Sequence, residues 1–192
     1  MIADAQLAAT APADKGGAVV AFMNTGGIRA DLTFAGSAAG EGDGKVTYGE
    51  AFTVQPFGNS LVVKTLTGQQ LYELLNQQWA VGQFADGGRT LQVSSGFTYC
   101  HTFFPNVSPL GGQYVCDGSV AINGVAVDKA ASYRVAMNSF LAAGGDNFGV
   151  FNLGTDQIGG DLALDALEAY LAARSPVAPG PRDRIQQVAA CN

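Results

Sequence analysis

The stretch AVVAFMNTGGIR, residues 18–29, decides how this chain folds. Its first five residues are apolar and include two valines, which is typical of a short buried strand. The polar and glycine residues that follow, 23–27, indicate that this strand ends in a tight turn. Binding residues gather in loops at the ends of strands, so we expect the first part of a functional site at residues 23–29.

A second strand end has the same character. Tyr133, Val135 and Met137 alternate along a strand, and residues 138–148, NSFLAAGGDNF, then open into a glycine-rich loop. The chain contains 26 glycines, many of them in pairs, which fits tight turns and a close approach of backbone to ligand. Both loops are therefore expected to carry function.

The rest of the chain alternates between helical and extended patterns. Thr47 and Glu50 form a capping-box pair before a short helix over Tyr48–Thr53, and Thr67 caps a second helix. Two further helices are expected at 2–10 and 164–171, and Asp161 is expected to cap the second of them. Strands are expected at 61–65 and at 91–99, the second interrupted at 94–96, and a hairpin is expected at 119–127. Interleaved in this way, they predict the α+β (mixed α/β) class, with a mixed sheet in a single domain over residues 1–192.

Composition limits the classes of function. Of the 192 residues, 47% are hydrophobic and 14% are charged, as in a compact folded protein. The net charge of -6 disfavours a nucleic-acid polymer as partner, so an anionic ligand needs locally placed cations. No apolar run approaches the roughly 20 residues of a membrane span, and residues 1–5 lack the basic and apolar regions of a signal peptide.

Three cysteines are present: Cys100, Cys116 and Cys191. The first two flank a turn-rich insert with two prolines and a Gly-Gly pair, so we expect a disulfide between Cys100 and Cys116. Cys191 is then free, or pairs with something outside the chain. The alternative is that Cys100 and Cys116 are two buried thiols on neighbouring strands.

The sequence offers little for catalysis. It has one histidine, His101, no cysteine pair at metal-ligand spacing and no Gly-x-Ser-x-Gly, Walker or dinucleotide motif. His101 lies beside Cys100 in the insert, where a structural or solvent-facing role is the simpler interpretation. We therefore expect no catalytic residue and no metal or cofactor bound by this chain.

Six side chains at turns and strand ends remain as binding candidates: Asn24, Arg29, Phe57, Asn59, Phe140 and Asp146. The arginine is a permanent cation, the phenylalanines can stack a flat base, and the polar groups can contact a base edge or a ribose diol. The arginine, the two phenylalanines and the aspartate each have a structural alternative. The arginine can pair with Asp31, the phenylalanines can belong to the core, and the aspartate can stabilise its own turn.

Four segments resemble the C-terminal domain of the 5′-nucleotidase / UDP-sugar hydrolase family. They are NTGGIR at 24–29, VTYGEAFTVQPFGN at 46–59, LQVSSG at 91–96 and NSFLAAGGD at 138–146. Each segment alone is weak. Together, in this order and spacing, they are specific and cover about residues 2–175.

The resemblance implies a substrate-binding role for seven residues: Asn24, Arg29, Phe57, Asn59, Gly96, Phe140 and Asp146. The phenylalanines sandwich the nucleobase, the asparagines contact base or sugar, the aspartate holds the ribose hydroxyls, the arginine binds phosphate, and the neighbourhood of the glycine affects base or sugar preference. In the family, two divalent metal ions and a histidine catalyse hydrolysis in a separate N-terminal metallophosphoesterase domain, whose motifs are absent from this sequence.

The chain is therefore expected to be the substrate-binding part, inactive alone, of a periplasmic or secreted hydrolase of nucleoside monophosphates or nucleotide sugars. Two departures from the family stand out: its further phosphate-binding arginines precede the position of Asp4, outside this sequence, and the insert from Cys100 to Cys116 is longer than a simple hairpin. The alternatives are a non-enzymatic nucleotide- or nucleoside-binding module, and a divergent member whose pocket has closed.

Overall fold

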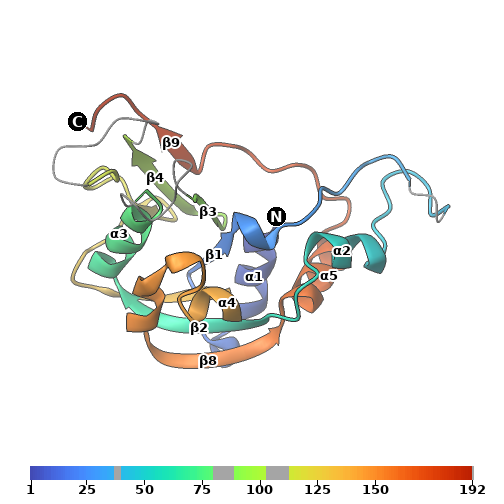
Figure 1. The fold of residues 1–192 in the computed structure, drawn as a ribbon, viewed down its shortest axis with the longest axis horizontal. Coiled ribbons are helices and arrows are strands. Elements are labelled where there is room, and N and C mark those ends of the chain that lie inside the picture. The colour runs from blue at the N-terminus through green and yellow to red at the C-terminus, as the bar shows by residue number, and fades with distance from the viewer. Residues whose placement is uncertain (37–39, 80–88, 103–112, 192) are drawn as a thin grey trace.

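The fold is mixed α/β, as the sequence predicts, and contains two mixed sheets (Figure 1). The structure is a computed structural model and describes residues 1–36, 40–79, 89–102 and 113–191. The described α-helices are α1 (Ile2–Thr10), α2 (Tyr48–Val54), α3 (Gly68–Gln77), α4 (Ser139–Ala142) and α5 (Ala163–Arg174). Helices α2 and α5 lie together at one end of the larger sheet (Figure 1). Among the described helices, none is long and apolar enough to cross a membrane.

The larger sheet has five strands in the order β3-β1-β7-β2-β8. Their bounds are β1 Val20–Asn24, β2 Ser60–Thr67, β3 Leu91–Val93, β7 Ser132–Asn138 and β8 Thr155–Leu162. Strands β1 and β7 are parallel, and the other neighbours are antiparallel. The carboxyl ends of β1 and β7 therefore meet at one edge of the sheet, next to the start of β2, where Leu61 lies opposite Asn138.

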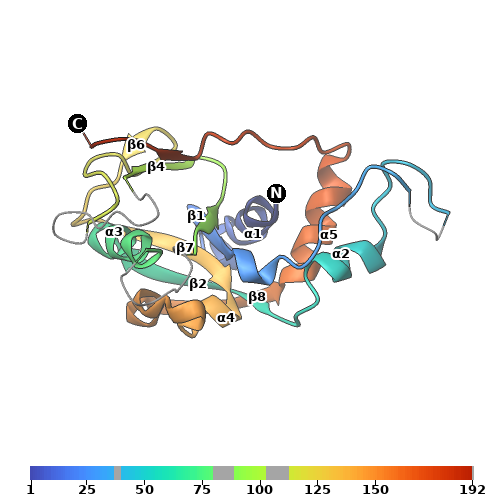
Figure 2. The same cartoon turned by 45° about the horizontal axis from the view of Figure 1, so that its top comes forward.

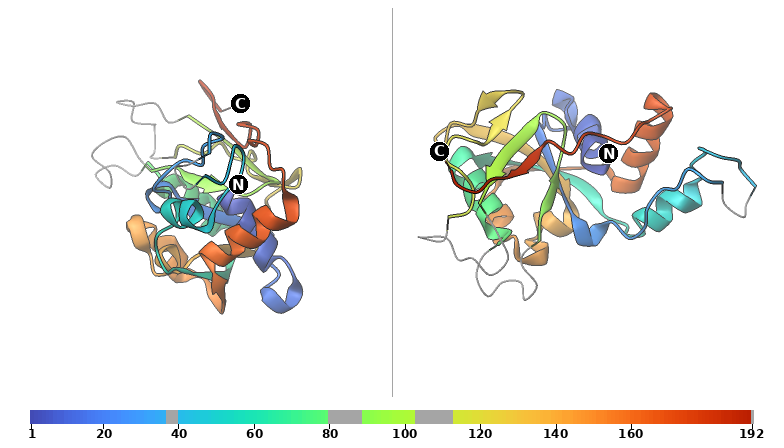
Figure 3. Two further views of the ribbon diagram at one scale, coloured as in Figure 1. Left: turned by 90° about the vertical axis from the view of Figure 1, so that its right-hand side faces the viewer. Right: turned by 90° about the horizontal axis from the view of Figure 1, so that it is seen from above.

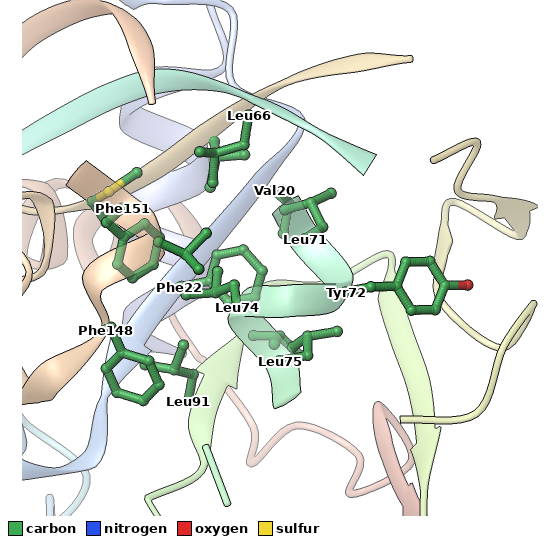
Figure 4. Packing of buried hydrophobic residues seen from close by; sticks show 14 of the residues in the cluster. Val20, Phe22, Leu66, Leu71, Tyr72, Leu74, Leu75, Leu91, Phe148 and Phe151 are labelled. Atoms are coloured by element: carbon green, nitrogen blue, oxygen red, sulfur yellow. The ribbon is translucent and has the colours of Figure 1, made fainter. Parts of the chain in front are cut away.

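Alternation along the strands gives this sheet a face of large residues and a face of small ones. On the large face, Val20 and Phe22 pack against the apolar stripe of α3 and against Phe148 and Phe151, which follow α4 (Figure 4). On the small face, three alanines and a valine lie against Leu7 of α1: Ala18, Ala21, Ala136 and Val63. Figure 2 shows α1 and α4 on opposite sides of the sheet.

The smaller sheet has the order β6-β5-β4-β9, with β4 at Phe97–His101, β5 at Ala121–Ile122, β6 at Val125–Ala126 and β9 at Ile185–Gln187. The predicted hairpin at residues 119–127 is confirmed, because β5 and β6 pair across Asn123 and Gly124, whose φ angles are 51° and 77°. Strand β9 runs parallel to β4 (Figure 3, right). The last part of the described chain is thereby fixed beside β4.

The predicted capping box at Thr47 and the predicted cap at Thr67 are confirmed, and Gln70 completes a second box that was not predicted. Thr47 and Thr67 each accept a hydrogen bond from the backbone three residues on, while Glu50 and Gln70 accept one in return from the capping residue. The expected cap at Asp161 is wrong. This residue belongs to β8 and its carboxylate pairs with Lys15 at 3.2 Å, while α5 starts after Leu162 without a side-chain cap.

The expected disulfide between Cys100 and Cys116 is also wrong. Cys116 is bonded to Cys191, with 5.2 Å between their Cα atoms, and Cys100 is a free thiol. The physical reason is the pairing of β9 with β4, which carries the distant residue Cys191 to the insert. Sequence spacing favoured the near cysteine because it contains no information about that long-range pairing.

His101 supplies a pH test of this region. Its ring centroid lies 4.5 Å from that of Trp79 and 6.2 Å from that of Tyr99, and burial lowers the pKa of His101 below its ordinary value of 6.5. The folded protein then binds this proton more weakly than the unfolded chain. We expect the free energy of unfolding to fall as the pH drops from about 7 to about 5. Urea titrations across this range check the slope, which His101→Gln should flatten.

Candidate functional site

The site is built on the paired ends of β1 and β7. Each of these strands ends in a buried asparagine, and the Asn138 amide donates to Asn24 Oδ1 at 3.0 Å. The same Asn138 side chain caps α4, because its Oδ1 accepts the N–H of Leu141 at 2.9 Å. This hydrogen bond from the neighbouring strand fixes the side chain of Asn24, whose Nδ2 group faces outward from the edge of the sheet.

The outward amide of Asn24 meets Asp146. Its Nδ2 donates to Asp146 Oδ2 at 2.9 Å, and Arg89 pairs with the other carboxylate oxygen. Asp146 has a φ of 53°, in the left-handed region, so the turn that follows α4 aims its carboxylate back at the sheet. The structure thus brings together two of the candidate residues, Asn24 and Asp146, and places Asp146 in the turn, as its structural alternative expects.

Arg89 is the residue that sequence reasoning missed. It precedes β3, and pairing of Leu91 with Asn24 brings it to the site edge. The side chain is about half exposed, whereas Asp146 is mostly covered. No local motif marks this arginine, so only the β1–β3 pairing could have revealed it.

The two phenylalanines are exposed, contrary to the core alternative. Phe57 is 46% exposed and Phe140 is 44% exposed, and these two rings are not among the ring pairs found in the described residues. Phe140 lies over Gly145, where a Cβ atom would come within 2.5 Å of the ring. A glycine at 145 is therefore required for this position of the ring.

Arg29 and Asn59 lie around the first phenylalanine. The guanidinium of Arg29 is 5.9 Å from the centre of the Phe57 ring and donates to the carbonyl of Gly26 at 3.1 Å. It forms no ion pair with Asp31, so that alternative is not what the structure shows. Asn59 Oδ1 accepts from the hydroxyl of Ser139 at 3.2 Å, which links the start of β2 to α4.

Lys64 fixes the segment that carries Phe140 and Asp146. Its buried ammonium donates to the carbonyl of Ala142 at 2.8 Å and to that of Phe151 at 3.0 Å. Burial lowers the pKa of Lys64 from its ordinary value. This lysine of β2 thus ties both ends of the glycine-rich turn to the sheet.

Gly96 is not brought together with the other six residues. It follows β3 at the end where Val93 pairs with Phe22, so it lies at the opposite end of β1 from Asn24. Its φ is 85°, and a Cβ atom there would come within 2.2 Å of the Asn123 amide oxygen. The glycine is required by the turn between β3 and β4 and by its contact with the hairpin.

The edge combines aromatic rings, amides and guanidinium groups. Within the part of the chain that the structure describes, no group of three or more histidine, cysteine, aspartate or glutamate side chains could hold a metal ion. What the edge offers is two half-exposed rings, amides fixed by buried hydrogen bonds, and the guanidiniums of Arg29 and Arg89. Such an arrangement suits a flat polar ring that bears an anionic group.

The family model described as "5'-nucleotidase, C-terminal domain" matches residues 1–153. The chain belongs to this family.

Relatives with known names are similar to most of this chain. The trifunctional nucleotide phosphoesterase protein YfkN of Bacillus subtilis is 39% identical over 153 residues, which is 78% of this chain and 9% of that protein. Protein UshA of Escherichia coli is 30% identical over 173 residues, 90% of this chain and 27% of that protein. A crystal structure of a 5'-nucleotidase precursor from Thermus thermophilus matches with a TM-score of 0.74 and 31% identity, over 97% of this chain and 34% of that one. The chain thus spans about a third or less of these relatives.

Asn138 allows a test of how the site is held. Asn138→Ala removes both the cap of α4 and the donor to Asn24, so we expect a loss of about 1–3 kcal/mol in the free energy of unfolding. Asn138→Asp retains the cap but places an oxygen against Asn24 Oδ1. Chemical denaturation of both variants separates the two effects: if only the cap matters, Asn138→Asp should match the unsubstituted protein.

Proposed function

We propose that this chain is the nucleotide-recognition domain of a 5′-nucleotidase-type phosphohydrolase. The ligand is a nucleoside 5′-monophosphate, with nucleotide sugars as a further class. The observation that carries the proposal is the hydrogen-bonded chain from Asn138 through Asn24 to Asp146, beside two exposed rings. Membership of the family supports the same assignment.

Each part of the edge fits a part of a nucleotide. Phe57 and Phe140 sandwich the base, because stacking on aromatic rings suits every base. Asn24 and Asn59 contact the base edge or sugar, and Asp146 accepts hydrogen bonds from the ribose hydroxyls. The guanidinium of Arg29 binds the phosphate through charge-assisted hydrogen bonds.

Hydrolysis belongs to another part of the parent protein. We propose that residues 1–192 form one substrate-binding domain, linked in the parent to an N-terminal metallophosphoesterase domain with two divalent metal ions. When bound there, such ions activate water for attack on phosphorus. The disulfide between Cys116 and Cys191 fits an oxidising compartment, the periplasm or the outside of the cell.

Calorimetric titration with adenosine tests the base site. Phe140→Ala should weaken adenosine binding by about 1–3 kcal/mol, or roughly 5- to 150-fold in Kd, because a stacking surface is lost. Phe52→Ala is the matched control, since Phe52 is an equally exposed ring on α2 at 48%. Equal affinities for the two variants, with intact folding, would remove Phe140 from the site.

Titration with AMP and inorganic phosphate tests the anion site. Arg29→Ala should weaken AMP binding by about 1.5–3 kcal/mol, the range for a hydrogen bond to a charged group, and leave adenosine binding nearly unchanged. Arg182→Ala, at an exposed arginine far along the chain, serves as control. A parallel assay with added Mn²⁺ or Zn²⁺ should give no phosphate release, and turnover by this chain would contradict the proposal.

A further inference from the structure

The chain contains three cysteines, and two of them form a disulfide. Cys116 is bonded to Cys191, and Cys100 carries a free thiol that is partly exposed. A free thiol next to a disulfide can attack it, because exchange proceeds through a thiolate and needs no external oxidant. The question is therefore whether the fold places Cys100 within reach of Cys116.

Cys100 and Cys116 occupy opposite positions on two antiparallel segments. The Cys116 N–H donates to the carbonyl of Cys100 at 3.0 Å, and the adjacent residues His101 and Val115 form an antiparallel bridge. Opposite residues of such a pair project to the same face, with Cα atoms roughly 5.5 Å apart. That separation lies inside the range of about 4.4–6.8 Å in which disulfides form.

Ser119 holds these two positions together. Its hydroxyl accepts from the Cys100 N–H at 3.1 Å and donates to the carbonyl of Cys116 at 2.7 Å. On the other side of β4, residue Gln186 of β9 lies opposite Cys100, and the Val188 N–H donates to the carbonyl of His101 at 2.9 Å. Cys116 therefore lies opposite Cys100 of β4 and is also bonded to Cys191, which follows β9 in the chain.

We propose that Cys100, Cys116 and Cys191 form an intramolecular thiol–disulfide exchange site. The Cys100 thiolate attacks the Cys116 sulfur, a bond forms between these two sulfurs, and the bond to Cys191 breaks. Cys191 leaves as a thiolate and takes up a proton, so the number of disulfides and thiols does not change. The exchange frees the segment after Val188 from its covalent tie and exposes the Cys191 thiol for mixed disulfides.

The structure holds the bond to Cys191, which closes a separation of 75 residues, whereas a bond from Cys100 to Cys116 closes 116 minus 100, or 16. Loop-closure entropy separates the two isomers in the unfolded chain, where the shorter closure costs less. It does not separate them in the folded chain, because the strands already hold these segments in place. We expect the bond to Cys191 to predominate in the folded protein, with the exchanged isomer as the minor population.

Peptide mapping distinguishes the two isomers. The chain is held at about pH 8 without reductant, where thiolates are present, then quenched with N-ethylmaleimide and cut with trypsin. No lysine or arginine lies between Arg89 and Lys129, so Cys100 and Cys116 share the peptide 90–129, and Cys191 lies in the peptide 185–192. The structure described above gives the two peptides joined, with label on 90–129. The exchanged isomer gives a separate, labelled peptide 185–192.

The controls remove only the attacking thiol. Both Cys100→Ser and unsubstituted chain alkylated before the incubation should yield no labelled 185–192. Labelled 185–192 in the untreated chain, at a first-order rate independent of protein concentration, is the expected result. The proposal is overturned if the untreated chain gives no more of this peptide than the controls, or if the rate rises with protein concentration, which indicates exchange between molecules.

Discussion

The parallel pairing of β1 with β7 is the constraint on which the rest of the structure depends. It sets Val20, Ala21 and Phe22 opposite Val135, Ala136 and Met137, so the two strands end side by side. Parallel strands require a long crossover, and here more than a hundred residues, with α2, α3 and the whole smaller sheet except β9, lie between them. Asn24, Asn138 and Asp146 are thereby brought together at the single edge where both strands end.

Buried polar groups make this edge rigid. Asn24 and Asn138 are almost fully buried, and an unpaired amide at either position would cost free energy. In the structure the Asn138 amide donates to Asn24, the Asn138 oxygen caps α4, and the Asn24 amide donates to Asp146. The same hydrogen bonds that make the burial tolerable therefore also fix the orientation of the Asn24 amide and the Asp146 carboxylate.

The two aromatic rings at this edge come from a loop and from a short helix. Phe57 follows α2 and Phe140 lies on the single turn of α4, each nearly half exposed. Exposure by itself does not mark a ligand contact, because Phe52 of α2 is equally exposed. The binding variants proposed above separate these rings by function.

Much of the local structure follows from the sequence alone. The helix caps at Thr47 and Thr67 and the turn at Asn123-Gly124 depend on contacts within a few residues, and the sequence states those directly. The strand that ends at Asn24 could be predicted because its run of apolar residues is itself a local pattern. Strand β8 escaped prediction because all its side chains are exposed, so it lacks the apolar alternation that marks a strand.

Three features were decided only by the tertiary structure: the approach of Arg89 to Asp146, the distance of Gly96 from the site, and the choice of Cys191 as partner of Cys116. Each depends on which strands pair and in which register. That outcome is a property of the whole core, because a pairing between distant segments is selected by the apolar surface it buries. The sequence identified the residues that could bind a ligand or form a disulfide. The packing of the core determined which of these residues lie close enough to interact.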